Sequence, residues 1–398
     1  MQYPDRFAAL PAYPFPRLRA LLDHLPAGGP ALSMSIGDPT HPFPNFVGPK
    51  MTEHLARFGG YPPNDGAPEL IAAIDGWLTR RYRLAGFDAG AQVIPLNGTR
   101  EGLFNAALAL SPERKNGAQP AILLPNPFYQ CYMVAARAAG AEPVMVPALA
   151  ENGFLPDYAS LPRDILDRVT VAYICSPANP QGATADLAYW TQLLALAEKH
   201  DFRIFADECY AELYRDAPPV GALQAAQAVG ADPERVLVFH SLSKRSNLAG
   251  LRSGFAAGGL GSIAQIKQLR AFAGAPLPLP IQLVSAAVWN DEAHVVANRA
   301  LYAAKFDLAD RMLGNLAGIH TPQAGFFLWL PVENDEAAAV KLWTEHGVRV
   351  LPGRYLANET HARLGGGNPG QGYIRVALVA PIKEIEHGLG AIRASLYE

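Results

Sequence analysis

One lysine lies among residues that suit covalent chemistry on an aldehyde. Lys244 has hydroxyls beside it at Ser241 and Ser243 and a guanidinium eight positions further on, at Arg252. Short apolar runs on both sides predict buried strands, which puts the lysine on the loop between them. Only a neutral amine attacks an aldehyde, and desolvation near other positive charge lowers a lysine pKa enough to supply one. Because hydroxyls and a guanidinium are usual partners of a phosphate dianion, this loop suits an aldehyde cofactor that carries a phosphate.

A basic surface loop with helix-capping serines is the alternative interpretation. The segment Ser241-Leu-Ser-Lys244 alone would favour it, because serine is a common cap. Arg252, together with the strands on either side, favours the cofactor loop instead.

Strand and helix patterns alternate from about residue 92 to 260. The predicted strands are 93–96, 121–124, 143–146, 169–175, 202–206, 236–239 and 254–258. Such alternation implies crossover helices and a mostly parallel sheet that is buried on both faces. We therefore predict an α/β fold in which a large domain has a mostly parallel sheet flanked by helices.

A smaller α+β domain is predicted beyond residue 260, where the alternation stops. We expect residues 1–50 to form an N-terminal arm and part of this small domain, 51–290 the large domain, and 291–398 the rest of the small domain. The arm should hold a helix over 17–24 and a strand over 32–39. The remaining predicted helices are 263–272, one long helix from 282 to about 316 that bridges the domains, 336–346 and 382–396. The remaining predicted strands are 324–330, 348–351 and 372–378.

Polar residues follow three of the predicted strands, where open α/β sheets bind ligands. Gly98-Thr99-Arg100 opens a helix after the first strand, and its free N–H groups could hold a phosphate. Asn179 follows the strand 169–175, and Asp207 ends the next one. Each has an ordinary alternative, because glycine-threonine, asparagine-proline and aspartate are common at helix starts and turns.

The lysine loop resembles that of the fold-type I pyridoxal phosphate aminotransferases of the aspartate aminotransferase class. More narrowly, it resembles the succinyldiaminopimelate aminotransferases, and nearly the whole chain takes part in the resemblance. The segments that carry the narrower resemblance are 35–42, 97–101, 125–130, 240–247 and 289–294. The chain departs from the expected pattern at Gln181, where a threonine is expected, and at Ala249, where a proline is expected.

The resemblance implies a role for each candidate around pyridoxal 5'-phosphate. Lys244 would bond to the cofactor and move the substrate α-proton, as general base and then acid. Asp207 would keep the pyridine nitrogen protonated, so that the ring accepts electrons. Asn179 and Tyr210 would donate to the phenolic oxygen from two sides. The phosphate contacts would be Ser241, Ser243, Arg252 and the backbone of Gly98, Thr99 and Arg100.

The resemblance also implies contacts at the faces and edges of the cofactor. Tyr129, rather than Phe128, would stack on the ring, and Tyr61 would reach the cofactor phosphate of the partner in a homodimer. Arg375 would grip the substrate α-carboxylate, near Gly37 and Asn179. Without the resemblance, the aromatic residues would read as core or loop residues, Gly37 as a turn and Arg375 as half of an internal ion pair.

Composition excludes several other classes of protein. The 398 residues carry a formal net charge of −3, which argues against a nucleic-acid partner. The three cysteines are widely spaced, so neither a disulfide framework nor a metal site is predicted. We see no signal pattern and no run of transmembrane length, and we expect a cytoplasmic protein without membrane partners.

The expected reaction is transamination between glutamate/2-oxoglutarate and N-succinyl-2-amino-6-oxopimelate/N-succinyl-LL-diaminopimelate, in lysine biosynthesis. An aminotransferase for aspartate, alanine or N-acetylornithine, or a pyridoxal phosphate-dependent lyase, remains open, because fold and cofactor do not decide the reaction. A cofactor-sensing regulator is disfavoured, because no basic helix-turn-helix pattern precedes residue 50. For the remote end of the substrate we expect contacts near His41 and from the loop 274–280.

Overall fold

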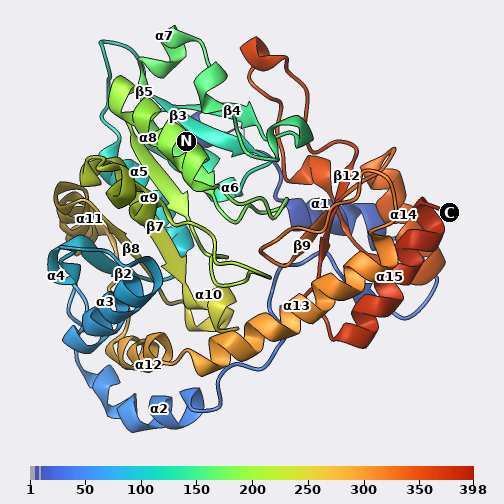
Figure 1. Ribbon diagram of the computed structural model, residues 1–398, viewed down its shortest axis with the longest axis horizontal. Helices are drawn as coiled ribbons and strands as arrows, with labels where there is room; N and C mark the ends of the chain where they lie inside the picture. The colour runs from blue at the N-terminus through green and yellow to red at the C-terminus, as the bar shows by residue number, and fades with distance from the viewer. Residues whose placement is uncertain (1–4, 9) are drawn as a thin grey trace.

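The computed structural model describes residues 5–8 and 10–398. A large unit built around one sheet forms most of the molecule, and a smaller unit from the C-terminal quarter packs beside it (Figure 1). None of the helices within the described residues is long and apolar enough to cross a membrane. Over the same residues, no group of three or more histidine, cysteine and acidic side chains is placed to hold a metal ion.

The large unit contains a seven-stranded sheet that is mostly parallel, as predicted. In spatial order its strands are β2 (Val93–Leu96), β8 (Gly254–Gly258), β7 (Val236–Ser241), β6 (Arg203–Asp207), β5 (Val169–Cys175), β3 (Ala121–Asn126) and β4 (Glu142–Pro147). Only β8 runs antiparallel to its neighbours, β2 and β7. The carboxyl ends of β5 and β6 lie side by side, since Cys175 pairs with Asp207.

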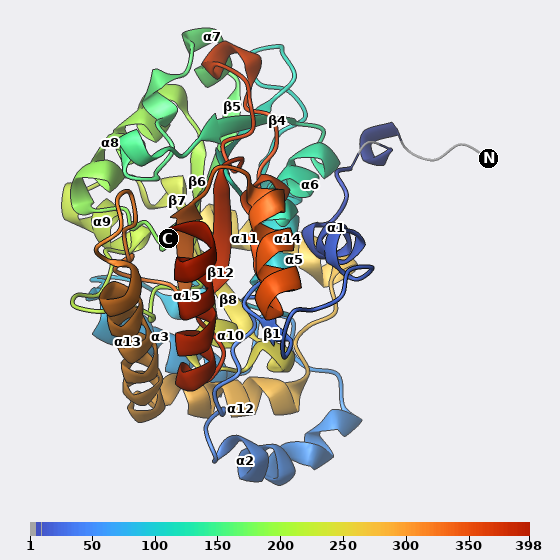
Figure 2. The same cartoon turned by 90° about the vertical axis from the view of Figure 1, so that its right-hand side faces the viewer.

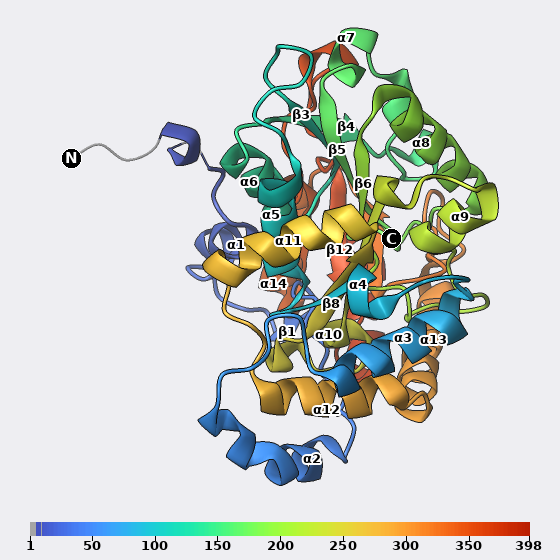
Figure 3. The ribbon, with the colours of Figure 1, turned by 90° about the vertical axis from the view of Figure 1, so that its left-hand side faces the viewer.

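Helices cover both faces of this sheet, so alternate strand residues enter two separate cores. Ile122 and Leu124 of β3 pack with one set of helices, whereas Ala121 and Leu123 pack with the other. The first set is α5 (Thr99–Leu110), α6 (Gln130–Ala138) and α11 (Leu260–Ala273). The second set is α3 (Pro68–Tyr82), α8 (Leu187–His200), α9 (Ala222–Val229) and α12 (Leu279–Asn290). Figure 3 shows α11 and α5 in front of the sheet.

The smaller unit joins the C-terminal segment to part of the N-terminal arm. Its antiparallel sheet is β11 (Leu351–Pro352), β12 (Tyr373–Ala377) and β9 (Phe327–Pro331), and β1 (Leu32–Ser33) pairs in parallel with β10 (Val348–Arg349). Its helices are α13 (Ala293–Leu313), α14 (Asp335–His346) and α15 (Ile382–Leu396) (Figure 2). Leu32 and Met34 enter the same core as these helices. The division of the chain into domains stays a prediction.

Shorter helices connect these elements. They are α1 (Pro14–Leu22), α2 (Val47–His54), α4 (Ala89–Gln92), α7 (Arg163–Leu166) and α10 (Leu242–Arg245). The helix expected over 17–24 is therefore α1, which begins earlier because Pro14 favours a first helical turn.

Three other predicted elements differ more strongly from the structure. The long helix expected from residue 282 is two helices, because Asp291 takes an extended conformation and its carboxylate accepts from the His294 N–H at the start of α13. Of these two helices, α13 is the one that runs between the two units (Figure 1). The strand expected over 32–39 ends at Ser33, and the one over 348–351 is divided between β10 and β11, which pair with different partners.

Candidate active site

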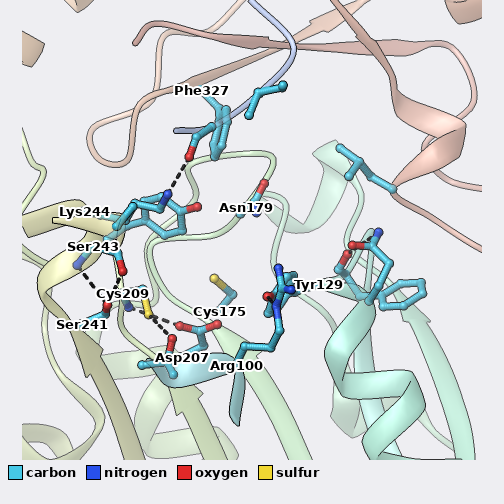
Figure 4. Close-up of a pocket in the computed structure, with 18 of the residues that line it drawn as sticks. Arg100, Tyr129, Cys175, Asn179, Asp207, Cys209, Ser241, Ser243, Lys244 and Phe327 are labelled. Carbon is cyan, nitrogen blue, oxygen red and sulfur yellow. Dashed lines mark hydrogen bonds between the residues drawn. The ribbon is translucent and has the colours of Figure 1, made fainter. Parts of the chain in front are cut away.

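A cavity of about 350 Å³ lies at the carboxyl ends of the parallel strands, where the smaller unit faces the large one. Figure 4 shows side chains from β5, β6, the α5 start and the lysine turn pointing into this common space. Twelve predicted residues line it: Gly37, Thr99, Arg100, Tyr129, Asn179, Asp207, Tyr210, Ser241, Ser243, Lys244, Arg252 and Arg375. Groups from seven separate stretches of chain thus converge on one ligand-sized space.

Lys244 is carried by the first turn after β7. Ser241 ends the strand and caps α10, since its Oγ accepts from the Ser243 N–H over 3.0 Å. The lysine Nζ donates to the Gly37 carbonyl over 2.6 Å. Burial lowers the pKa of Lys244 to about 8, even though Asp38 opposes that change. Near pH 8 about half of this amine is therefore neutral and able to attack a carbonyl carbon.

Arg252 and the serine pair form one edge of the cavity. The arginine adopts a left-handed conformation (φ 56°), and its guanidinium donates to the Ala249 carbonyl over 2.8 Å. Ser241 Oγ and Ser243 Oγ lie 2.8 Å apart. None of the salt bridges among the described residues involves Arg252, so its charge is available to a phosphate.

Gly98 stands directly behind this guanidinium. It does not itself line the cavity, but it begins α5 with φ of 80°, and a Cβ there would lie 2.1 Å from Arg252 Nη2. Glycine is therefore required twice, for its backbone conformation and for the room that it leaves to the arginine. The sequence pattern predicted only a backbone contact to phosphate.

Asp207 lies buried at the end of β6, on the floor of the cavity. Tyr132 donates its hydroxyl to Oδ2 over 2.7 Å, and the Cys209 N–H donates to Oδ1 over 3.3 Å. Burial raises the pKa of the Asp207 carboxyl, whereas these hydrogen bonds oppose that change. A cationic nitrogen placed against it would find a dry, oriented carboxylate.

Arg375 lies buried on β12, and no carboxylate of the described residues forms a salt bridge with it. It donates to Asn179 Oδ1 over 2.9 Å and to the Ser35 carbonyl over 2.7 Å, and its guanidinium carbon lies 4.3 Å from the centre of the Phe327 ring. The Nε atom is buried without a hydrogen-bond partner in the described structure. Burial lowers the pKa of Arg375 to about 10, so it stays charged at neutral pH. An unpaired buried cation with a free N–H is a site for an anionic ligand.

The mouth of the cavity carries a further cation. The Arg100 Nε donates to the Tyr129 hydroxyl, and Arg100 Nη2 lies 3.5 Å from the hydroxyl of Tyr13. The exposed side chain of Arg100 thus lies across the mouth, although only its backbone was predicted to act. Tyr13 and Phe15, just before and within α1, close the same side.

Three predicted contacts lie elsewhere in the single chain. Tyr61 is fully exposed on the segment between α2 and α3. His41 is turned towards α13, and its ring lies 4.7 Å from that of Tyr302. Neither His41 nor any residue of the loop 274–280 lines the cavity.

Other site residues were missed by sequence reasoning. Tyr132 lies one helical turn after Tyr129, a spacing that could have placed both rings at the same end of α6. Cys209 stands between Asp207 and Tyr210, and its Sγ lies 3.1 Å from Thr99 Oγ1. No sequence feature near Phe327 or Ser35 indicated that they contact Arg375, because only the folding of the small unit brings them to it.

The fold and this set of groups define a site for a small phosphorylated cofactor and an anionic substrate. The family model for aminotransferase class I and II matches residues 31–392. An LL-diaminopimelate aminotransferase of Dehalococcoides mccartyi is 31% identical over 98% of this chain and 98% of its own length. Among solved structures, an aminotransferase of Neisseria meningitidis is 38% identical, with a TM-score of 0.92 over 98% of this chain and 99% of that one. A probable N-succinyldiaminopimelate aminotransferase of Thermus thermophilus is 25% identical, with a TM-score of 0.82 over 96% of this chain and 100% of that one.

The chain belongs to the class I and II aminotransferases. Enzymes of this family depend on pyridoxal phosphate, and the residues of the cavity fit that cofactor. Arg252 with its two serines suits the phosphate, Asp207 suits the pyridine nitrogen, and the neutral fraction of Lys244 suits the aldehyde.

Replacing Gly98 by alanine should weaken cofactor binding. The new Cβ would force the Arg252 guanidinium away from the phosphate side, in addition to straining the backbone. We expect a loss of affinity for pyridoxal phosphate of at least roughly tenfold, the size of one lost charge-assisted hydrogen bond. Equilibrium dialysis would measure it, with Gly250→Ala as the control, because a Cβ at Gly250 meets nothing within 4 Å. Equal affinities in both variants would contradict this role of Gly98.

Lys244 should be the residue that bonds to the cofactor. The pH dependence of the rate of bond formation should reflect its lowered pKa. Capture of pyridoxal phosphate by cofactor-free protein, followed by visible absorbance, should accelerate as pH rises through about 8, because the neutral amine increases there. Borohydride reduction and peptide mapping should then place the label on Lys244. Lys244→Ala should bind the cofactor reversibly without transamination, whereas Lys383→Ala, at an exposed lysine, should behave as the native protein. A label on another lysine would refute the assignment.

Proposed function

We propose that this protein transfers an amino group between glutamate/2-oxoglutarate and the N-succinyl-2-amino-6-oxopimelate/N-succinyl-LL-diaminopimelate pair. The observation that carries the reaction type is the convergence of Lys244, Asp207 and Arg375 on one cavity. When bound, pyridoxal phosphate supplies an aldehyde for the amino group and a ring that accepts the electron pair of the substrate α-carbon.

The chain's own groups divide the remaining work. Arg375 holds the substrate α-carboxylate, with its free Nε added to the donors at the Nη positions. That contact places the α-carbon within reach of Lys244 Nζ, which takes the α-proton and returns it. Asn179 fixes the guanidinium from one side, and Phe327 covers it from another. Asp207 and Tyr210 hold the cofactor in place from the floor of the cavity.

The succinylated substrate is proposed from the narrower sequence resemblance, with the Thermus thermophilus structure in support. The Dehalococcoides mccartyi relative is named for LL-diaminopimelate itself, which makes the unmodified amino acid the second candidate. Both molecules place a second carboxylate far from the reacting carbon. The two candidates differ in the succinyl group at the remote end, which the mouth of the site must accommodate. The chemistry at Lys244 is the same for both.

Arg100 is the group that we assign to a remote carboxylate. Its guanidinium lies at the mouth and is exposed. Among the described residues, its N–H groups donate only to the hydroxyls of Tyr129 and Tyr13. Glutamate, 2-oxoglutarate and the diaminopimelate derivatives all carry a carboxylate beyond the one that Arg375 takes. A flexible cation at the rim can meet carboxylates of different reach, which a double-substrate enzyme requires.

We also propose a homodimer in which Tyr61 completes the partner's site. The tyrosine is fully exposed, and the large apolar side chains of Leu55 and Phe58 near it are half exposed. An aromatic with no packing in its own chain, next to other exposed apolar groups, is typical of a contact between subunits.

A substrate panel would test the proposed substrate. Removing the succinyl group should lower kcat/KM at least roughly tenfold, about 1.4 kcal/mol, because remote contacts contribute to rate as well as to affinity. Single-turnover absorbance would compare N-succinyl-LL-diaminopimelate with LL-diaminopimelate, aspartate and N-acetylornithine. Equal rates for LL-diaminopimelate would favour the second candidate, and equal rates for aspartate would exclude both.

Arg100→Gln serves within the same panel as the probe of the mouth. It should lower the rate of amino transfer from glutamate more than that from alanine, because alanine lacks a second carboxylate. The control Arg114→Gln, at an exposed site elsewhere, should lower neither rate. Release of ammonia instead of amino transfer would show a lyase.

Tyr61→Phe should loosen the cofactor without changing the fold. Loss of one hydrogen bond to the phosphate would cost on the order of 1 kcal/mol, which corresponds to roughly fivefold faster cofactor loss on gel filtration. Light scattering should show a dimer for both proteins. A fully active native monomer would refute the shared site.

A further inference from the structure

A buried lysine beside the active site has no counter-ion among the residues that the structure describes. Lys305 on α13 is 2% exposed, and its pKa is lowered to about 8 by burial. Its Nζ lies 2.7 Å from His41 Nε2 and donates to the Val379 carbonyl over 3.0 Å. Within the described structure no carboxylate pairs with it. Since burying such a cation is costly, its hydrogen bonds should serve a purpose beyond packing.

The chemistry of Lys305 fixes the direction of a chain of hydrogen bonds. An ammonium group only donates, so His41 Nε2 must accept and the ring proton must be on Nδ1. His41 Nδ1 then donates to Asn298 Oδ1 over 3.1 Å. This contact leaves the Asn298 amide nitrogen to donate to the carbonyls of Lys244 and Arg245, each over 3.4 Å.

Lys244 is held at two points by groups attached to this chain of bonds. The backbone of the lysine turn is held by Asn298, as described. The amine is held by the Gly37 carbonyl, four residues before His41 on the same arm. Asn247 adds a cross-link, because its side-chain amide donates to Asn298 Oδ1 over 3.0 Å and to the Pro42 carbonyl over 3.2 Å. The arm and the lysine turn therefore meet on one buried asparagine of α13.

We propose that Asn298 and His41 are positioning residues for Lys244, and that this arrangement holds only while His41 is neutral. Asn298 sets the backbone of the lysine turn, and His41 sets the arm whose Gly37 carbonyl receives the amine. Both segments are hydrogen-bonded to Asn298 of α13, the helix that bridges the two units (Figure 1).

A protonated His41 could not occupy this position. Its Nε2–H would face the Lys305 ammonium group at 2.7 Å. The groups that face the ring come from α13, namely Asn298, Tyr302 and Lys305, and Lys305 is the charged one. Burial lowers the pKa of His41 below its usual 6.5 and the Lys305 charge adds to this, although the hydrogen bond to Asn298 opposes the change. A released arm binds the proton more readily than a docked arm, so docking weakens as pH falls below about 6.5.

Four variants of the holoenzyme test this proposal, in the half-reaction with glutamate. His41→Gln keeps one donor and one acceptor but cannot be protonated, whereas His41→Leu removes both. Asn298→Ala removes the shared amide, and His320→Gln, at an exposed histidine, is the control. We would measure kcat and KM from pH 5 to 9, and hydrogen–deuterium exchange of residues 34–42 at pH 7.5. Because glutamate is the substrate, the result does not depend on the proposed long substrate.

We expect His41→Leu and Asn298→Ala to lower kcat roughly tenfold or more, with KM changed less than about threefold, and to increase exchange in the arm. His41→Gln should keep kcat within about threefold at pH 7.5. Below about pH 6.5 its kcat should fall less steeply than that of the native enzyme and of His320→Gln, because only the decline due to Lys244 remains. The proposal would be overturned by native kcat and native exchange in His41→Leu. An equally steep fall of kcat below about pH 6.5 in His41→Gln and in the native enzyme would also overturn it. That result decides the question if the other two variants fail to fold.

Discussion

The structure depends on holding positive charge in a dry cavity without neutralising it. Lys244 is half-buried and Arg375 is buried, and neither pairs with a carboxylate of the described chain, so desolvation lowers the pKa of each. Carboxylates at these positions would stabilise the protein and also occupy the places that the ligands need. Backbone carbonyls and amide oxygens provide the solvation instead, from Gly37, Ser35 and Asn179. These neutral acceptors satisfy some of the donors and leave the charge available.

Sheet geometry brings the opposing groups to the same place. Asp207 ends β6, while β5 ends beside it at Cys175 and leads into the loop of Asn179, so that parallel pairing places both at one edge. Lys244 follows β7, the next strand along. Asp207 on the cavity floor lies on the opposite side from Phe327 (Figure 4), and Phe327 packs on Arg375, which comes from the sheet of the smaller unit. A single sheet could not have supplied both ends of the site.

Residues next to strand ends were predictable, because a local motif carries both the strand and the functional group. Lys244 and Asp207 belong to this group, and the structure brings them to one cavity. Contacts made by folding of distant segments were not predictable from spacing. The packing of Phe327 on Arg375, and the need for glycine at position 98 beside Arg252, arise from segments far apart in the chain. The break between α12 and α13 was missed because the apolar pattern continues past Asp291, where a single side chain decides the end of the helix.

The meeting of the arm and the lysine turn on Asn298 has a consequence for changing this enzyme by design. The arm lines the substrate side of the cavity at Gly37, which makes it an obvious segment to exchange when a different amino acid is to be accepted. It is not an independent module, however, because residues 40–42 bond to α13, to Val379 and to Asn247. A grafted arm would need the matching side chains at positions 298 and 305 to come with it. Substitutions meant to change the substrate specificity should therefore be made at the rim around Tyr13 and Arg100. Side chains there can change without altering the contacts that hold Lys244.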